Sequence, residues 1–154
     1  MVLSGPDSFG LRFDHKRFQV IHADGARTFR GRACSRVPKL YVVTAKGGIV
    51  YVGVTRQSMQ SRLRLGWSAD GSTGYYGYAF RRALRVARLH VWYHEDFERS
   101  KGALDVETVE AELVFLVRQR RQWPEYQTEI HFHPSSRVHR ALARRIFEFC
   151  ARAG

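Results

Sequence analysis

The chain has 154 residues, with 26 Lys and Arg against 14 Asp and Glu, which gives a formal net charge of +12. This length suits one domain with a single buried core, and a hydrophobic fraction of 44% excludes a largely disordered chain. A positive charge of this size predicts an anionic partner, either nucleic acid or an acidic membrane surface. Charge alone does not distinguish the two.

Neither an export signal nor a membrane span is predicted. Residues 1–6 lack a basic region followed by an apolar stretch, and no window approaches the roughly eighteen apolar residues that a span needs. We therefore expect a cytoplasmic protein with no membrane partner. Cys34 and Cys150 lie far apart and outside any CxxC pair, so neither a disulfide framework nor a cysteine-based zinc site is expected.

Residues 1–38 are predicted to form an N-terminal arm and a hairpin. Glycine, proline and serine residues in 1–10 indicate a loose arm. The runs 11–23 and 26–29 flank Asp24-Gly25, a dipeptide that suits a tight hairpin turn because it tolerates positive φ. A segment studded with arginines then leads through Pro38 into the main unit.

Residues 39–127 are predicted to form the core of the domain. The runs 40–44 and 49–54 are rich in β-branched and aromatic residues, and glycines between them supply the turn of a second hairpin. Ser58 is expected to cap a helix that extends to Leu65. A loop rich in glycine and aromatic residues follows at 66–78.

The rest of the chain alternates helices and strands. A helix is predicted over 80–88 and a strand over 89–95, followed by a long helix that begins near Asp105 and ends before Pro124. Early glutamates and late arginines in that helix match its dipole.

Residues 128–154 are assigned to the same domain, with an edge strand at 129–133 and a final helix from Ser135 or Ser136 to about Ala151. The expected fold class is therefore α/β (α+β). It has a small, mainly antiparallel sheet of about three central strands flanked by helices, and the N-terminal hairpin and C-terminal helix are additions.

Two tyrosines occupy matching places in the second hairpin: Tyr41 follows Lys39-Leu40, and Tyr51 precedes Val52-Gly53. Arg62 lies in the next helix, and the long helix leads into Pro124-Glu125-Tyr126-Gln127. In these elements residues 39–127 resemble the GIY-YIG nuclease superfamily. The resemblance implies an endonuclease that hydrolyses DNA phosphodiester bonds with Mg²⁺ or Mn²⁺ as cofactor.

The resemblance also implies a role for each position. Arg62 would hold the scissile phosphate, for which its planar donor fork is suited. Tyr41 and Tyr51 would orient or deprotonate the attacking water, and which of them acts on the water stays open. Glu112 would ligate the metal ion, and Gln127 would help to position the phosphate or a metal-bound water.

Two glutamates compete for the role of metal ligand. Glu112 and Glu110 both emerge from a largely apolar helix, where an unpaired carboxylate is costly and a bound Mg²⁺ would account for that cost. We choose Glu112, because its spacing to Gln127 matches the spacing of the glutamate and the terminal asparagine in some family members.

Three positions depart from the family pattern. Lys39 replaces the first glycine of the motif, Gln127 replaces the terminal asparagine, and Gly66 stands where many members carry His or Tyr. If the role of that missing side chain is kept, a tyrosine of the following loop has to supply it, and the candidates are Tyr75, Tyr76 and Tyr78.

Basic and aromatic residues around the motif predict the DNA-binding surface. Arginine greatly outnumbers lysine, which favours bidentate contacts to phosphate. The rings of the 66–78 loop either stack on an exposed base, wedge a groove of the DNA or pack the loop. The expected DNA contacts are Lys39, Arg56, Arg64, Trp67, Tyr75, Tyr76, Arg81, Arg82 and His133.

Two other classes of function remain open. A non-catalytic nucleic-acid-binding module would keep the fold and the charge, and the three departures favour it. A basic protein-interaction domain would use the charge against an acidic partner. The sequence contains no recognisable separate DNA-reading domain, so specificity would come from the added elements, from a homodimer or from a partner protein.

Overall fold

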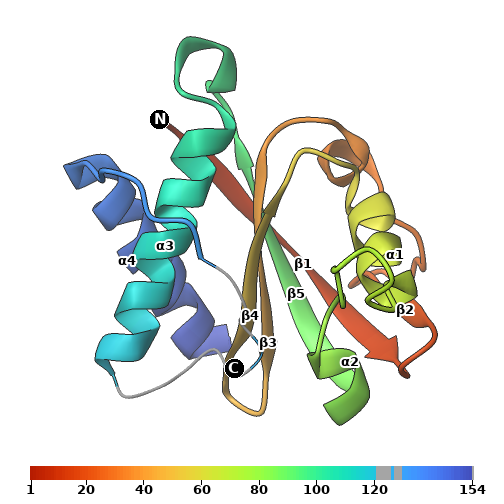
Figure 1. Ribbon diagram of the computed structural model, residues 1–154. Coiled ribbons are helices and arrows are strands. Elements are labelled where there is room, and N and C mark those ends of the chain that lie inside the picture. The colour runs from red at the N-terminus through yellow and green to blue at the C-terminus, as the bar shows by residue number, and fades with distance from the viewer. Residues whose placement is uncertain (121–125, 127–129, 154) are drawn as a thin grey trace.

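The computed structural model describes residues 1–120, 126 and 130–153. They form a five-stranded antiparallel sheet with helices on both faces, as Figure 1 shows. The strands are β1 (Leu3–Phe13), β2 (Phe18–Ile21), β3 (Lys39–Ala45), β4 (Gly48–Thr55) and β5 (Val86–His94). The helices are α1 (Met59–Ser68), α2 (Phe80–Ala83), α3 (Ala103–Gln119) and α4 (Arg137–Ala153), with 3₁₀ turns η1 (Gly31–Cys34) and η2 (Phe97–Arg99). The predicted α+β class is confirmed, but the sheet has five strands rather than about three.

The N-terminal residues form an inner strand of the sheet, and the prediction of a loose arm at 1–10 is wrong. The strand order is β2-β1-β5-β3-β4, so β1 lies between β2 and β5. Phe9, Leu11 and Phe13 alternate into the core, as the period of a strand requires. Pairing with β5, which comes much later in the chain, orders this segment, and its composition alone does not reveal that partner.

The N-terminal hairpin turns earlier than predicted. β1 and β2 are joined at Asp14, whose Oδ1 accepts the backbone N–H groups of Lys16 and Arg17 at 2.7 and 2.8 Å. The predicted turn at Asp24-Gly25 instead follows β2, and the segment 26–29 is not a strand. The turn is thus stabilised by an aspartate side chain that binds the backbone of its own turn, whereas the prediction looked for a glycine.

The β3–β4 hairpin is confirmed. Its two turn residues, Lys46 and Gly47, both have positive φ, at 53° and 79°, as a type I′ turn requires. The register pairs Tyr41 with Gly53. β4 is an outer strand of the sheet, and the backbone N–H of Tyr126 donates to the carbonyl of Val50 in it at 3.2 Å.

Two further predictions need correction. The helix predicted over 80–88 ends at Ala83, because β5 begins at Val86, where it pairs with Arg12 of β1. The edge strand predicted at 129–133 is not formed by its described residues, 130–133, which have no regular secondary structure. The helices predicted before Pro124 and after Ser136 are confirmed as α3 and α4.

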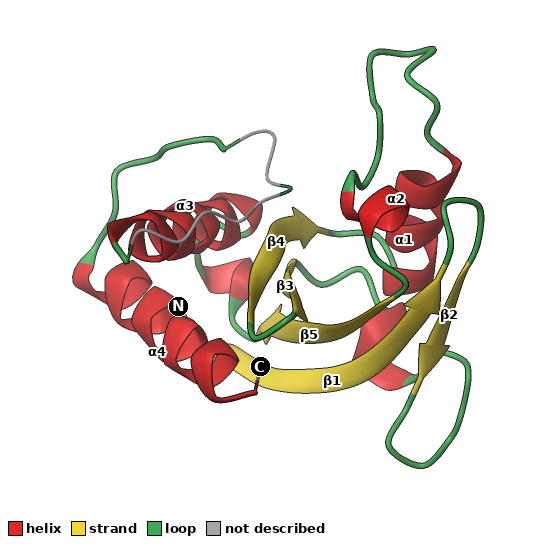
Figure 2. Ribbon diagram, turned by 90° about the horizontal axis from the view of Figure 1, so that it is seen from below, coloured by secondary structure: helices red, strands yellow, loops and turns green. Residues whose placement is uncertain are grey.

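Each face of the sheet has its own hydrophobic core. One face packs against α1 and α2 through residues such as Leu11, Tyr41 and Leu63, and the other packs against α3 and α4 through residues such as Val42 and Leu113. Seen from below in Figure 2, α3 and the α1–α2 pair stand on either side of β4. Helices from both layers therefore border the same outer strand.

Candidate active site

An open cleft of about 660 Å³ lies beside β4. Its lining comes from β4, from α1 and the loop after it, from α3 and from the segment before α4. The lining residues are Tyr51, Gly53, Val54, Arg62, Gly74, Tyr75, Tyr76, Gly77, Glu110 and His131. The fold thus brings a predicted tyrosine and the predicted arginine into one cleft with a carboxylate.

The two motif tyrosines have different surroundings. Tyr41 is fully buried, and its hydroxyl oxygen lies 2.9 Å from that of Tyr78. Tyr51 is half-buried and lines the cleft. Both rings lie over Gly53, where an added Cβ would come within 2.6 Å of Tyr41 Cζ and 2.8 Å of Tyr51 Cε1, so the motif glycine makes room for them. Tyr51 is therefore the tyrosine that can reach a substrate, and Tyr41 packs behind it.

Burial determines the protonation state of the tyrosines. It raises the pKa of Tyr41, Tyr51 and Tyr78 well above that of a free phenol, and the positive charge of Arg62 offsets only part of this effect. These phenols therefore stay protonated at neutral pH. Of the three, Tyr51 is the one that lines the cleft, where a protonated hydroxyl is a hydrogen-bond donor.

Arg62 is held in place by α1 and by two tyrosines. The helix starts at its N-cap Ser58, whose Oγ accepts the Ser61 N–H at 3.2 Å, and Arg62 is the next residue. Arg62 Nη1 donates to the Tyr75 hydroxyl at 2.8 Å, and its guanidinium carbon lies 5.5 and 5.4 Å from the ring centroids of Tyr75 and Tyr78. Burial lowers the pKa of Arg62, but the neighbouring tyrosine hydroxyls raise it by more, so the pKa lies above that of a free arginine. The arginine stays charged.

Glu110, rather than the predicted Glu112, lines the cleft. Glu110 is 7% exposed and Glu112 is half-buried, two positions further along α3. An α-helix turns about 100° per residue, so these two side chains leave α3 in nearly opposite directions. The apolar residues Val106, Val109 and Leu113 face the sheet and fix this rotation. The structure thus places Glu110, and not Glu112, in the cleft lining, because the spacing to Gln127 does not report which way the helix is turned.

The donor set of the cleft fits a divalent cation that keeps water among its ligands. Mg²⁺ is commonly bound by one or two carboxylates together with water and substrate phosphate, and Mn²⁺ prefers similar oxygen ligands. Within the described residues, no group of three or more His, Cys, Asp or Glu side chains could hold a metal ion. Glu110 would therefore hold the ion with water and phosphate oxygens, without a complete cage of protein ligands.

A loop tyrosine takes the space that Gly66 leaves open on α1. A Cβ at Gly66 would overlap the ring of Tyr78, and a Cβ at Gly77 would overlap the carbonyl oxygen of Gly66. These two glycines let the loop approach α1 closely enough to bring the Tyr78 hydroxyl to Tyr41. Of the candidates weighed from the sequence, Tyr78 is thus the one that occupies the place of a larger residue at 66.

Lys39 does not face DNA, contrary to prediction. It is fully buried, and its Nζ donates to the backbone carbonyls of Ser35, Val37 and Gln57 at 2.6, 2.9 and 3.0 Å. Burial, followed by the charge of Arg32, lowers the pKa of Lys39 to about 8. The lysine ties the segment before β3 to the β4–α1 connection, a role that its charge did not indicate.

Trp67 and Arg81 are also structural. Trp67 is 5% exposed, and its Nε1 donates to the carbonyl of Asp14 at 3.0 Å. Arg81 is 4% exposed, and its guanidinium donates to the carbonyl of Gly66 and, at 2.7 Å, to that of Ala69. The prediction that these two residues contact DNA is therefore wrong. Their side chains instead bind backbone carbonyls at the end of α1 and in the β1–β2 turn.

The other residues that were expected to contact DNA include three arginines and His133. Arg56, Arg64 and Arg82 are exposed, as their expected contact with DNA requires. His133 Nε2 lies 2.9 Å from the Glu107 carboxylate, whereas His131, not singled out as a DNA contact, lines the cleft. Gln127 lies outside the described residues.

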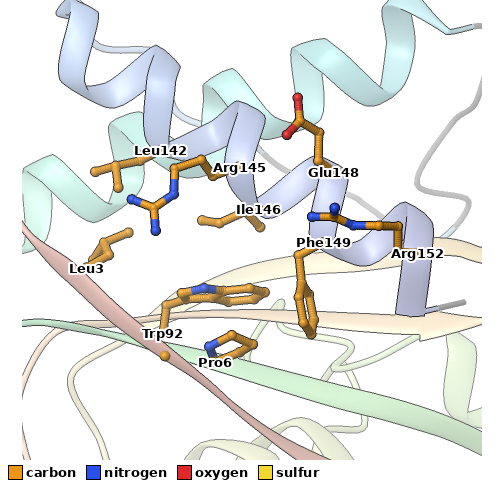
Figure 3. Close-up of a pocket in the computed structure, with 10 residues that line it drawn as sticks. Leu3, Pro6, Trp92, Leu142, Arg145, Ile146, Glu148, Phe149 and Arg152 are labelled. Atoms are coloured by element: carbon orange, nitrogen blue, oxygen red, sulfur yellow. The ribbon is translucent and has the colours of Figure 1, made fainter.

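A second cavity, of about 210 Å³, lies between α4 and strands β1 and β5. Figure 3 shows Arg145 and Arg152 reaching from α4 over its mouth, with Trp92 and Pro6 below them. Among the described residues that line it, Glu148 is the one acid, and none was predicted to be catalytic. The cleft beside β4 is therefore the stronger candidate for an active site.

Comparisons with protein-family models, with curated proteins and with solved structures find no match for this chain. None of the described helices is long and apolar enough to cross a membrane. The function is therefore inferred from the geometry of the cleft and from the sequence motif.

Proposed function

We propose that the chain is a divalent-metal-dependent endonuclease that hydrolyses DNA phosphodiester bonds in the cleft beside β4. The observation that carries this proposal is the convergence of Tyr51, Arg62 and Glu110 on one open cleft, from three separate elements. The reaction needs positive charge at the phosphate and an activated water; Arg62 offers the charge, Glu110 a carboxylate for a metal ion whose bound water would lose its proton more readily to solvent, and Tyr51 a hydroxyl that orients the water.

Each side chain supports a distinct step. Arg62 binds the scissile phosphate through its donor fork and stabilises the negative charge that grows on the phosphate oxygens. Tyr51 donates a hydrogen bond that orients the attacking water, since its phenol stays protonated at neutral pH. Tyr75 holds the guanidinium of Arg62 by accepting a hydrogen bond from Nη1.

Glu110 would hold the divalent ion at the edge of the cleft. A bound Mg²⁺ or Mn²⁺ supplies Lewis-acid charge at the phosphate and lowers the pKa of its water ligands. The position of Glu110 in the cleft lining, together with Arg62 and Tyr51, supports this assignment.

A plasmid-nicking assay tests the proposal. Supercoiled DNA is incubated with Mg²⁺ or Mn²⁺ and wild-type protein, and the nicked and linear products are measured over time. Arg62→Ala is expected to lower the rate on the order of 100-fold or more, since it removes the charge that stabilises the phosphate. Arg99→Ala, at an exposed arginine that is neither in the cleft lining nor among the expected DNA contacts, is the control and should cut at a rate within a few fold of wild type.

The same assay distinguishes the alternatives. If wild type leaves plasmid and single-stranded DNA intact with every metal tested, the endonuclease proposal fails. Retained DNA binding would then indicate the non-catalytic nucleic-acid-binding module, and an absence of DNA binding at low salt would indicate the protein-interaction domain.

A further inference from the structure

Tyr76 places an aromatic ring in solvent at the cleft. Its side chain is 72% exposed, the largest exposed fraction among the large hydrophobic side chains that the structure describes. The same residue lines the cleft with Arg62 and Tyr51. A single exposed ring is ordinary at a protein surface, but a ring that lines the same cleft as Arg62 is placed to contact a substrate bound there.

The loop holds this ring in a defined position. A Cβ at Gly71 would overlap the Tyr76 ring, so the ring rests against the backbone at that glycine, whose φ is +89°. The Gly71 N–H donates to the carbonyl of Tyr75, and the Gly74 N–H donates to that of Gly71, each at 3.0 Å. A ring mounted on a hydrogen-bonded turn loses little conformational entropy on binding.

The other aromatic side chains near the loop are already engaged. Trp67 is buried and bonded to the backbone, Tyr75 accepts a hydrogen bond from Arg62, and Tyr78 is bonded to Tyr41. Tyr76 is the ring of this loop that stays largely exposed. Trp67, Tyr75 and Tyr78 are therefore held by contacts within the protein, and Tyr76 is the ring that remains for a contact with a base.

We propose that Tyr76 stacks on an unpaired nucleobase of the DNA strand that lies in the cleft. This inference rests on the proposed function and names the substrate class: DNA that carries single-stranded nucleotides next to the scissile phosphate. Inside a duplex both faces of a base are covered by its neighbours, whereas an unpaired base has a face free for an aromatic side chain. Arg62 then binds a phosphate of the same strand.

Two DNA probes of equal charge test the stacking. One is a labelled thymidine strand of about 12 nucleotides, and the other has the same phosphates but no bases. Fluorescence anisotropy without divalent metal measures binding without cleavage. Wild type and Tyr76→Phe should bind the thymidine strand about 5- to 150-fold more tightly than the base-free strand, the range expected for one stacked base. Tyr76→Ala should lose this preference.

A second exposed ring provides the control. Phe132 is 69% exposed and is not among the described residues that line the cleft, so Phe132→Ala should keep the preference for bases. Equal affinity of wild type for the two strands, or an equal loss on both strands in Tyr76→Ala, overturns the stacking site. A base preference that depends on Tyr76 in a protein that cuts no DNA supports the stacking site while the proposed nuclease function fails.

Discussion

The hydroxyl oxygens of Tyr41 and Tyr78 lie 2.9 Å apart, although 37 positions separate the two residues in the chain. The contact joins β3 of the sheet to the loop that follows α1. It forms because glycines at 53 and 66 leave space for the two rings. This hydrogen bond thus connects the buried motif tyrosine to the loop that borders the cleft.

This hydrogen bond gives the first prediction. Tyr41→Phe or Tyr78→Phe alone leaves a buried hydroxyl without its partner and should lower the free energy of unfolding by about 1–3 kcal/mol. The double variant removes both hydroxyls and should cost less than the sum of the single changes. Urea unfolding of the four proteins measures the coupling, and strictly additive losses would show that the hydroxyls do not interact.

Gly66 gives the second prediction. A methyl group at this position overlaps the Tyr78 ring, so Gly66→Ala should lower the free energy of unfolding by about 1–3 kcal/mol, the usual cost of overpacking a core. Gly48→Ala is the control, since an added Cβ there meets nothing within 4 Å. Thermal unfolding of both variants checks this, and equal stabilities would contradict the close approach of the loop to α1.

His90 gives a prediction of pH dependence. Burial, and then the charge of Arg88, lowers its pKa to about 4, and its Nδ1 and Nε2 lie 2.7 and 3.1 Å from the hydroxyls of Ser8 and Thr44. Below pH about 6.5, the usual pKa of histidine, the unfolded chain binds a proton at His90 more readily than the folded chain does. The stability that the neutral ring contributes is therefore present above pH 6.5 and is lost as the pH falls towards 4.

The variant His90→Gln tests this effect. Wild type should lose up to about 3 kcal/mol of unfolding free energy between pH 6.5 and 4 through this group. The variant cannot titrate at this position, so its loss over the same range should be smaller by that amount. Chemical denaturation at a series of pH values measures the difference, and parallel curves for the two proteins would contradict a buried neutral imidazole.

The surface arginines give a prediction of salt dependence. Arg56→Gln and Arg64→Gln should each lower the slope of log affinity against log salt by about 0.9 for duplex DNA if that arginine neutralises one phosphate. Lys39→Met should leave the slope unchanged, because Lys39 is buried against carbonyls. Binding titrations at several salt concentrations measure the slopes, and a reduced slope for Lys39→Met would contradict its structural role.

Local signals in the sequence predicted the parts of the fold that local chemistry determines. The glycine turn between β3 and β4 and the Ser58 cap of α1 both work within a few residues, and both predictions are confirmed. The inner position of β1 and the early start of β5 depend on each other across the sheet. Neither segment shows that pairing in its own composition.

The candidate site shows the same division. The motif spacing predicted Arg62 and Tyr51, because strand register and helix start place them directly, and both line the cleft. Residue type did not predict the burial of Lys39, Trp67 and Arg81, since backbone carbonyls from other segments satisfy their donors. The choice between Glu110 and Glu112 required the rotation of α3, which tertiary packing determines.

The most direct measurement of the central claim compares Glu110→Gln with Glu112→Gln in Mg²⁺-dependent cleavage of supercoiled plasmid. Both changes remove one negative charge from α3 and keep the shape of the side chain. Glu110→Gln should lower the cleavage rate on the order of 100-fold or more, and Glu112→Gln should stay within a few fold of wild type. Loss of cleavage in Glu112→Gln with an active Glu110→Gln, or cleavage by wild type that continues in EDTA, would contradict a metal-dependent site in this cleft.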